Sequence, residues 1–155
     1  MIKSILINKY LAKEFAKVTV KSILIFLSLG FIMNLFEEIN FFKDIDNSFF
    51  YPILLTSLIV PSLLYEMFPF IILISGIFFF LKIKKSDEVT AMKISGMPNS
   101  SIILIPSLVA VLIGIFFVTS INPITSILVK KYESMKGNFE RDKDYLAAIT
   151  KNGIW

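Results

Sequence analysis

The sequence contains no cysteine and no histidine. Their absence excludes disulfides, thiol nucleophiles, Cys/His metal sites and histidine general bases, on which most soluble enzyme chemistries depend. A Gly-x-x-x-x-Gly-Lys-[Ser/Thr] phosphate-binding loop is also missing, so the chain does not bind and split ATP through the usual cradle of backbone amides and lysine. We therefore expect no catalytic residue, no metal and no cofactor, and any energy must come from a partner.

Charge is scarce as well. Charged residues make up 18% of the chain and hydrophobic residues 55%, whereas soluble domains have about 25% charged residues. The hydrophobic residues form long blocks separated by charge clusters, which one soluble core does not explain. The formal net charge is +4, but the lysines lie at the ends of the blocks, an arrangement typical of membrane topology and not of nucleic-acid binding.

Three of these blocks can each span a bilayer, at residues 16–36, 52–81 and 102–121. A helix rises about 1.5 Å per residue and the hydrocarbon core is about 30 Å thick, so roughly 20 residues suffice. In the long second block we expect kinks near Pro61 and Pro69, because a proline removes a backbone donor and displaces the carbonyl four residues earlier. The predicted fold class is an all-α integral membrane protein with three transmembrane helices.

The lysines also predict the orientation. The loop at 37–51 has one lysine and four carboxylates, whereas lysines gather before the first block and between the second and third. Because positively charged loops stay in the cytoplasm, we predict that the amino terminus and residues 82–98 are cytoplasmic. The acidic loop and the carboxy-terminal tail would lie outside. The lysines concerned are Lys3, Lys9, Lys13, Lys17, Lys21, Lys82, Lys84, Lys85 and Lys93.

We divide the chain after residue 121. Residues 1–121 form the predicted transmembrane region. Residues 122–155 are polar, with a helix-compatible run through Lys136 and a predicted stop at Gly137. The last residues, 149–155, read like the start of a strand-rich region that is cut off, so this part is predicted to be a helical extension followed by the start of a β-domain.

The segment between the second and third blocks predicts a short helix at about 86–96. Ser86 is a good N-cap, Asp87 and Glu88 would lie in the first turn where the helix dipole favours anions, and Gly96 with Pro98 would end the helix.

Two functions are open for this short helix. Val89 and Met92 form a small apolar edge next to Glu88, a shape suited to docking in a groove on another protein. An ordinary capped helix lying on the membrane surface would have the same pattern.

Two polar residues within the apolar blocks are candidates for lining a cavity. Glu66 is a carboxylate in the second block, and such groups by default face a helix bundle or a wet cavity. If the second span starts near Ser62, however, Glu66 lies about one turn from the interface and simply reaches water. Asn34, in the first block, is a milder case and more often forms an interhelical hydrogen bond.

Several motifs together resemble the lipopolysaccharide-export permease family LptF/LptG. They are Lys-Tyr-Leu at 9–11, Val-Pro at 60–61, Phe-Pro at 68–69 and Ser-Asp-Glu-Val-x-x-Met-Lys-x-Ser-Gly at 86–96. The last is the most specific, with Glu88 in the place of the family's glutamate. Asn-Gly-Ile-Trp at 152–155 is similar to the beginning of the family's periplasmic β-domain and favours the LptG-like branch.

The resemblance implies a function and a set of partners. Two permeases of six spans each would pair in the bacterial inner membrane, and an LptB-like ATPase dimer would bind their cytoplasmic coupling helices. Lipopolysaccharide would enter between the permeases and pass to periplasmic jellyroll domains and an LptC-like bridge protein. In this chain the coupling residues would be Asp87, Glu88, Val89, Met92 and Gly96. The match covers about the first half of the family's length, so we expect a truncated product or a fragment.

Two other functions are weighed against the permease. The first is a non-transporting membrane scaffold or assembly protein, which need not capture an ATPase subunit. The second is an intramembrane enzyme acting through Glu66, for which the sequence offers no second acid, histidine or metal partner.

Overall fold

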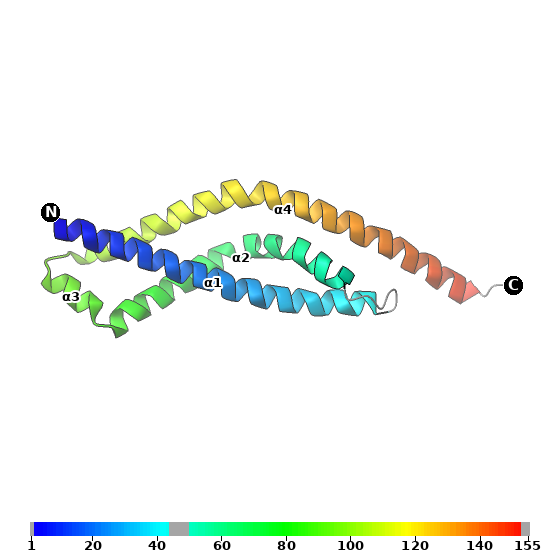
Figure 1. The fold of residues 1–155 in the computed structure, drawn as a ribbon, viewed down its shortest axis with the longest axis horizontal. Helices are drawn as coiled ribbons and strands as arrows, with labels where there is room; N and C mark the ends of the chain where they lie inside the picture. The colour runs from blue at the N-terminus through cyan, green and yellow to red at the C-terminus, as the bar shows by residue number, and fades with distance from the viewer. Residues whose placement is uncertain (1, 44–49, 153–155) are drawn as a thin grey trace. The chain divides into compact units, whose positions relative to one another are not determined.

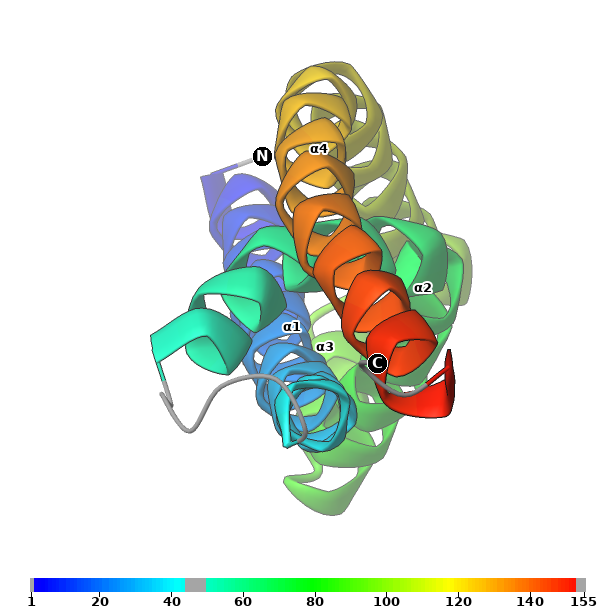
Figure 2. The same ribbon diagram turned by 90° about the vertical axis from the view of Figure 1, so that its right-hand side faces the viewer.

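The computed structural model describes the backbone of residues 2–43 and 50–152, and the side chains of residues 5–43 and 50–139. Every described element is a helix, as Figure 1 and the turned view in Figure 2 show. In chain order the helices are α1 (Ile2–Phe42), α2 (Phe50–Lys85), α3 (Glu88–Ile94) and α4 (Asn99–Asn152). The all-α prediction is therefore confirmed for this part of the chain.

Three of the helices, α1, α2 and α4, are long and apolar enough to cross a membrane. The stretches concerned are Ile5–Phe42, Phe50–Lys85 and Asn99–Phe139. They confirm three helices able to span a membrane, whereas the predicted bounds of the spans stay predictions. Large apolar side chains are exposed along all three helices, and Met33 reaches 73% exposure. A water-soluble monomer rarely exposes contiguous apolar surface on this scale, so these faces are suited to lipid or to other membrane helices.

The helices extend beyond the apolar blocks that predicted them. α1 continues to Phe42 and includes Glu37 and Glu38, which the sequence placed in the acidic loop. α4 continues through Gly137, where we predicted its end. A single glycine costs a helix only about 1 kcal/mol, and lysine and glutamate are good helix formers. Charges and one glycine therefore mark where apolar sequence stops, which is not where these helices stop.

The tail has no strand among its described residues, because α4 is helical to Asn152. This corrects the expectation that strand structure begins at Ile149. The remaining residues, 153–155, lie outside the described part of the chain, so the start of a β-domain stays a prediction. Similarly, α2 is one continuous helix through Pro61 and Pro69, and kinks at the two prolines stay predictions.

The chain forms two compact units. Unit 1 consists of Met1–Phe26 and Glu66–Ser120, and unit 2 of Leu27–Tyr65 and Ile121–Trp155. The core of unit 1 joins the first part of α1 to the end of α2, to α3 and to the start of α4. Its buried members are Leu11, Phe15, Val18, Phe79, Ile83, Met92, Met97 and Ile102.

Aromatic rings fix the packing within each unit. In unit 1, Phe15 of α1 and Phe79 of α2 meet edge to face, with ring centroids 5.5 Å apart. In unit 2, Phe42 of α1, Tyr51 of α2 and Phe139 of α4 form a three-ring cluster with centroid distances between 4.9 and 6.0 Å. Such ring pairs add about 0.5–1.5 kcal/mol beyond the area they bury.

Candidate functional site

The short helix α3 begins one residue later than the sequence predicted. Asp87, not Ser86, is its N-cap, with a left-handed backbone (φ 55°) and no side-chain capping bond. The Ser86 hydroxyl instead donates to the Lys82 carbonyl oxygen at 3.0 Å, at the end of α2. Ser86 therefore belongs to the end of α2, and the left-handed Asp87, a conformation that aspartate tolerates better than most residues, reverses the chain into α3.

The carboxyl end of α3 is a Schellman motif. Gly96 has φ 82°, and its N–H donates to the Lys93 carbonyl at 2.9 Å, while the Met97 N–H donates to the Met92 carbonyl at 3.1 Å. These two bonds satisfy carbonyls that the helix leaves free, and the positive φ is the reason for glycine. The predicted stop at Gly96 is confirmed.

The apolar edge of α3 faces the chain's own core. Met92 is buried, and Val89 packs against the core that Met92 belongs to. The structure places Val89 and Met92 toward the core of unit 1, and the docking role suggested for their apolar edge stays a prediction. The outward face carries Thr90, Ala91 and Ile94, and Ile94 is 83% exposed.

Helix α1 holds α3 through a hydrogen bond that the sequence did not predict. The Tyr10 hydroxyl of α1 donates to Glu88 Oε2 of α3 at 3.0 Å. Glu88 is half-buried and Asp87 is exposed. The Lys-Tyr-Leu motif at 9–11 thus has a structural explanation, since Leu11 is fully buried in the core and Tyr10 binds the glutamate of α3.

A second link joins α1 to the last turn of α2. Glu14 is buried, and Lys82 donates to its Oε1. Lys17 donates to the other carboxylate oxygen at 3.4 Å. Glu14 was not among the predicted site residues. It is the one acid among the first lysines of the chain, and that isolated charge was the available signal.

The comparison with protein families gives one result. Residues 9–155 match the family model described as lipopolysaccharide export system permease LptF/LptG. The chain belongs to the LptF/LptG family. No curated protein and no solved structure matches it. The family confirms the resemblance drawn from the motifs, and together with three apolar helices it indicates a multi-pass inner-membrane permease component.

The two predicted intramembrane polar residues of this LptF/LptG chain lie in different units. Glu66, on α2 in unit 1, is exposed and makes no hydrogen bond or ion pair with the described side chains. Asn34, on α1 in unit 2, is half-buried, and its Oδ1 has no hydrogen-bond partner there. A cavity-lining role for either residue stays a prediction.

Unit 2 contains a buried polar cluster that the sequence did not indicate. Glu38 is 0% exposed. Its Oε1 accepts from the Tyr132 hydroxyl at 2.7 Å and from Lys136 Nζ at 2.9 Å, and Lys136 also lies over the Phe41 ring. Glu38 Oε2 has no partner among the described atoms. Because the partners are 94 and 98 residues away in sequence, no local pattern predicts them.

Proposed function

We propose that this chain is a permease subunit of an ABC exporter that moves lipopolysaccharide from the inner membrane toward the outer membrane. A separate LptB-like ATPase dimer would supply the energy by docking on α3. Membership of the LptF/LptG family supports the transport role. The observation that carries the coupling role is the geometry of α3, a short helix fixed on its inner face and exposed on its outer face.

The exposed face of α3 supports docking of another protein. Ile94 is 83% exposed next to exposed Ala91 and Thr90. A bulky apolar side chain at the rim of a lysine-rich turn gains little from water and would gain free energy in an apolar groove of a partner. The contact would thus use Ile94, which the sequence did not single out, together with the exposed Asp87 about two turns away on the same side of the helix.

The inner face of α3 supports transmission of movement. Met92 packs in the core of unit 1, and Glu88 accepts from Tyr10 of α1. A displacement imposed on α3 by the ATPase would therefore act on α1 through packing and one hydrogen bond. In this proposal the inward attachment of α3 depends on Val89, Met92 and Glu88. Gly96 contributes by ending the helix with the positive φ that this turn requires.

The remaining partners belong to the same proposal. A second permease would pair with this one, and an LptC-like bridge protein would receive lipopolysaccharide from the pair. The exposed apolar faces of α1, α2 and α4 support packing against further membrane helices. The lysines around α3 support a cytoplasmic position for residues 82–98 and for the amino terminus.

The experiment is capture of the ATPase by the permease pair. Ile94→Asp should reduce co-purification of the ATPase by at least about tenfold, since burying an unpaired carboxylate in an apolar groove costs well over 1.4 kcal/mol. Leu6→Asp, at an apolar position of α1 that is 62% exposed and precedes the first apolar block, is the matched control. Membrane insertion is measured for each variant.

Two outcomes would contradict the coupling proposal. Normal ATPase capture by both Ile94→Asp and Glu88→Lys would show that α3 is not the docking helix. Failure of the unsubstituted chain to capture any ATPase, with normal insertion, would favour the membrane scaffold instead.

A further inference from the structure

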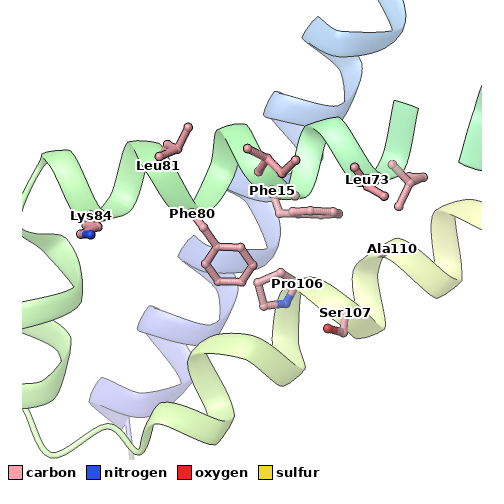
Figure 3. Close-up of a pocket in the computed structure, with 11 residues that line it drawn as sticks. Phe15, Leu73, Phe80, Leu81, Lys84, Pro106, Ser107 and Ala110 are labelled. Carbon is pink, nitrogen blue, oxygen red and sulfur yellow. The ribbon is translucent and has the colours of Figure 1, made fainter. Parts of the chain in front are cut away.

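An apolar groove runs along one face of α2 in unit 1 and has a lysine at one end (Figure 3). Its volume is about 550 Å³, within the range of about 300–1,000 Å³ that is usual for ligand pockets. Phe15 of α1 and Pro106, Ser107 and Ala110 of α4 complete the walls. The α2 residues that line it are Ile72, Leu73, Gly76, Ile77, Phe80, Leu81 and Lys84.

The chemistry of the groove is that of a lipid site. Its walls are apolar apart from Lys84 and the Ser107 hydroxyl, and that hydroxyl already donates to the Ile103 carbonyl at 2.9 Å. Lys84 forms no ion pair with any described carboxylate, whereas its neighbour Lys82 is paired with Glu14. Lys84 is therefore the cation available for an anion bound at the end of the groove next to α3.

The length of the groove matches one lipid tail. From Leu73 to Lys84 the helix rises about 16 Å at 1.5 Å per residue, and one leaflet contributes about half of a hydrocarbon core of about 30 Å. A tail lying along α2 would thus bring its headgroup to Lys84.

We propose that the groove holds one acyl chain of an anionic phospholipid, whose headgroup phosphate pairs with Lys84 in the leaflet next to α3. Basic residues between membrane helices commonly bind anionic headgroups in this way. Space is open beside Gly76 at the middle of the groove, because a Cβ at this position would meet no atom within 4 Å. This proposal goes beyond the export function, because the lipid would stay bound in the groove between α2 and α4 and would not be exported.

The test is photolabelling of the whole chain in phosphatidylcholine vesicles that contain a phosphatidylglycerol with a diazirine in its acyl chain. The label should attach to peptides covering residues 72–84 and 106–110, several-fold more with phosphatidylglycerol than with an equally labelled phosphatidylcholine. Lys84→Glu should abolish that preference. Lys85→Glu is the matched control, because Lys85 is also exposed at the end of α2 but does not line the groove.

A second variant tests the groove without touching its charge. Gly76→Leu should reduce labelling several-fold with both lipids, because the new side chain would enter the open space beside Gly76, where a Cβ meets no atom within 4 Å. Gly30→Leu, on α1 and equally unobstructed, should leave labelling unchanged. Helix content by circular dichroism verifies that each variant folds.

Two results would overturn the proposal. Equal labelling by both lipids that does not respond to Lys84→Glu would show an annular lipid only. Attachment of a photoreactive amino acid at position 77 to another polypeptide, in place of lipid, would show that the groove is a protein-packing surface.

Discussion

Two carboxylates on the same helix, Glu14 and Glu38, are both buried and paired with lysine, yet their surroundings differ. The side chains of Lys17 and Lys82, which bind Glu14, are 56% and 50% exposed. The Lys136 side chain, which binds Glu38, is only 17% exposed. Water can therefore reach the partners of Glu14 and compensate for a lost contact. The polar groups around Glu38 depend instead on hydrogen bonds with one another.

The same contrast separates the roles of the two sites. Tyr10 binds Glu88 of α3, the helix proposed to dock an ATPase, and Glu14 binds Lys82 in the last turn of α2, just before α3. In both contacts the donor side chain is exposed. The cluster at Glu38 combines an ion pair, a tyrosine and a cation–π contact. We expect the contacts of Tyr10 and Glu14 to adapt to movement of α3, and the cluster at Glu38 to resist movement.

The sharpest test of this contrast is Lys136→Met. It removes the cation that binds a fully buried carboxylate, and breaking such a pair destabilises by about 3–5 kcal/mol. The double variant Glu38→Leu with Lys136→Met removes both charges and should recover most of that loss. Unfolding of the helical signal in detergent measures both. Equal losses in the single and double variants would show that the ion pair is not what stabilises this region.

The next effect in size separates folding from docking within α3. Met92→Ala opens a cavity in the core of unit 1 and should destabilise by about 2 kcal/mol, the lower end for such substitutions because α3 is short. Ile94→Ala removes a mostly exposed side chain and should change stability by less than about 0.5 kcal/mol. For ATPase capture we expect Ile94→Ala to be impaired although its stability is nearly unchanged, because Ile94 would contact the ATPase directly. A large loss of stability from Ile94→Ala would contradict the outward position of this residue.

A smaller effect is expected from Lys82→Met, which removes one of the two exposed lysines that bind Glu14. Because the lysine is half-exposed and Lys17 remains beside Glu14, the loss should be about 1 kcal/mol or less, as for surface ion pairs. The difference should shrink at high salt, since exposed charges are screened. Lys85→Met is the control. A loss as large as that of Lys136→Met would remove the contrast between the two carboxylates.

The sequence predicted what depends on local composition. Three apolar blocks became three membrane-spanning helices, and Gly96 ended α3 because its φ of 82° suits glycine. Helix ends were predicted less well. Charged residues such as Glu37 suggested loops, but a helix backbone bonds to itself whatever its side chains carry, so α1 continues past them.

Contacts between distant residues could not be predicted from one sequence. Tyr10 and Glu88 are 78 positions apart, and only folding shows that they meet. The same holds for Met92, whose apolar character predicts burial somewhere but not whether the partner is the chain's own core or another protein. The motif therefore located α3, but the inward position of Met92 is seen only in the structure, and which residues would dock a partner stays a prediction.

A small expected effect, from Tyr10→Phe, tests whether a weak contact can still matter for coupling. The variant removes one hydrogen bond between partly exposed groups, so stability should fall by only about 0.5–1 kcal/mol. If α3 transmits movement to α1 through this bond, ATP hydrolysis by the assembled exporter should continue while export per ATP decreases. Tyr65→Phe is the control at another tyrosine. Unchanged export per ATP would leave packing of Met92 as the route of coupling and would exclude the tyrosine.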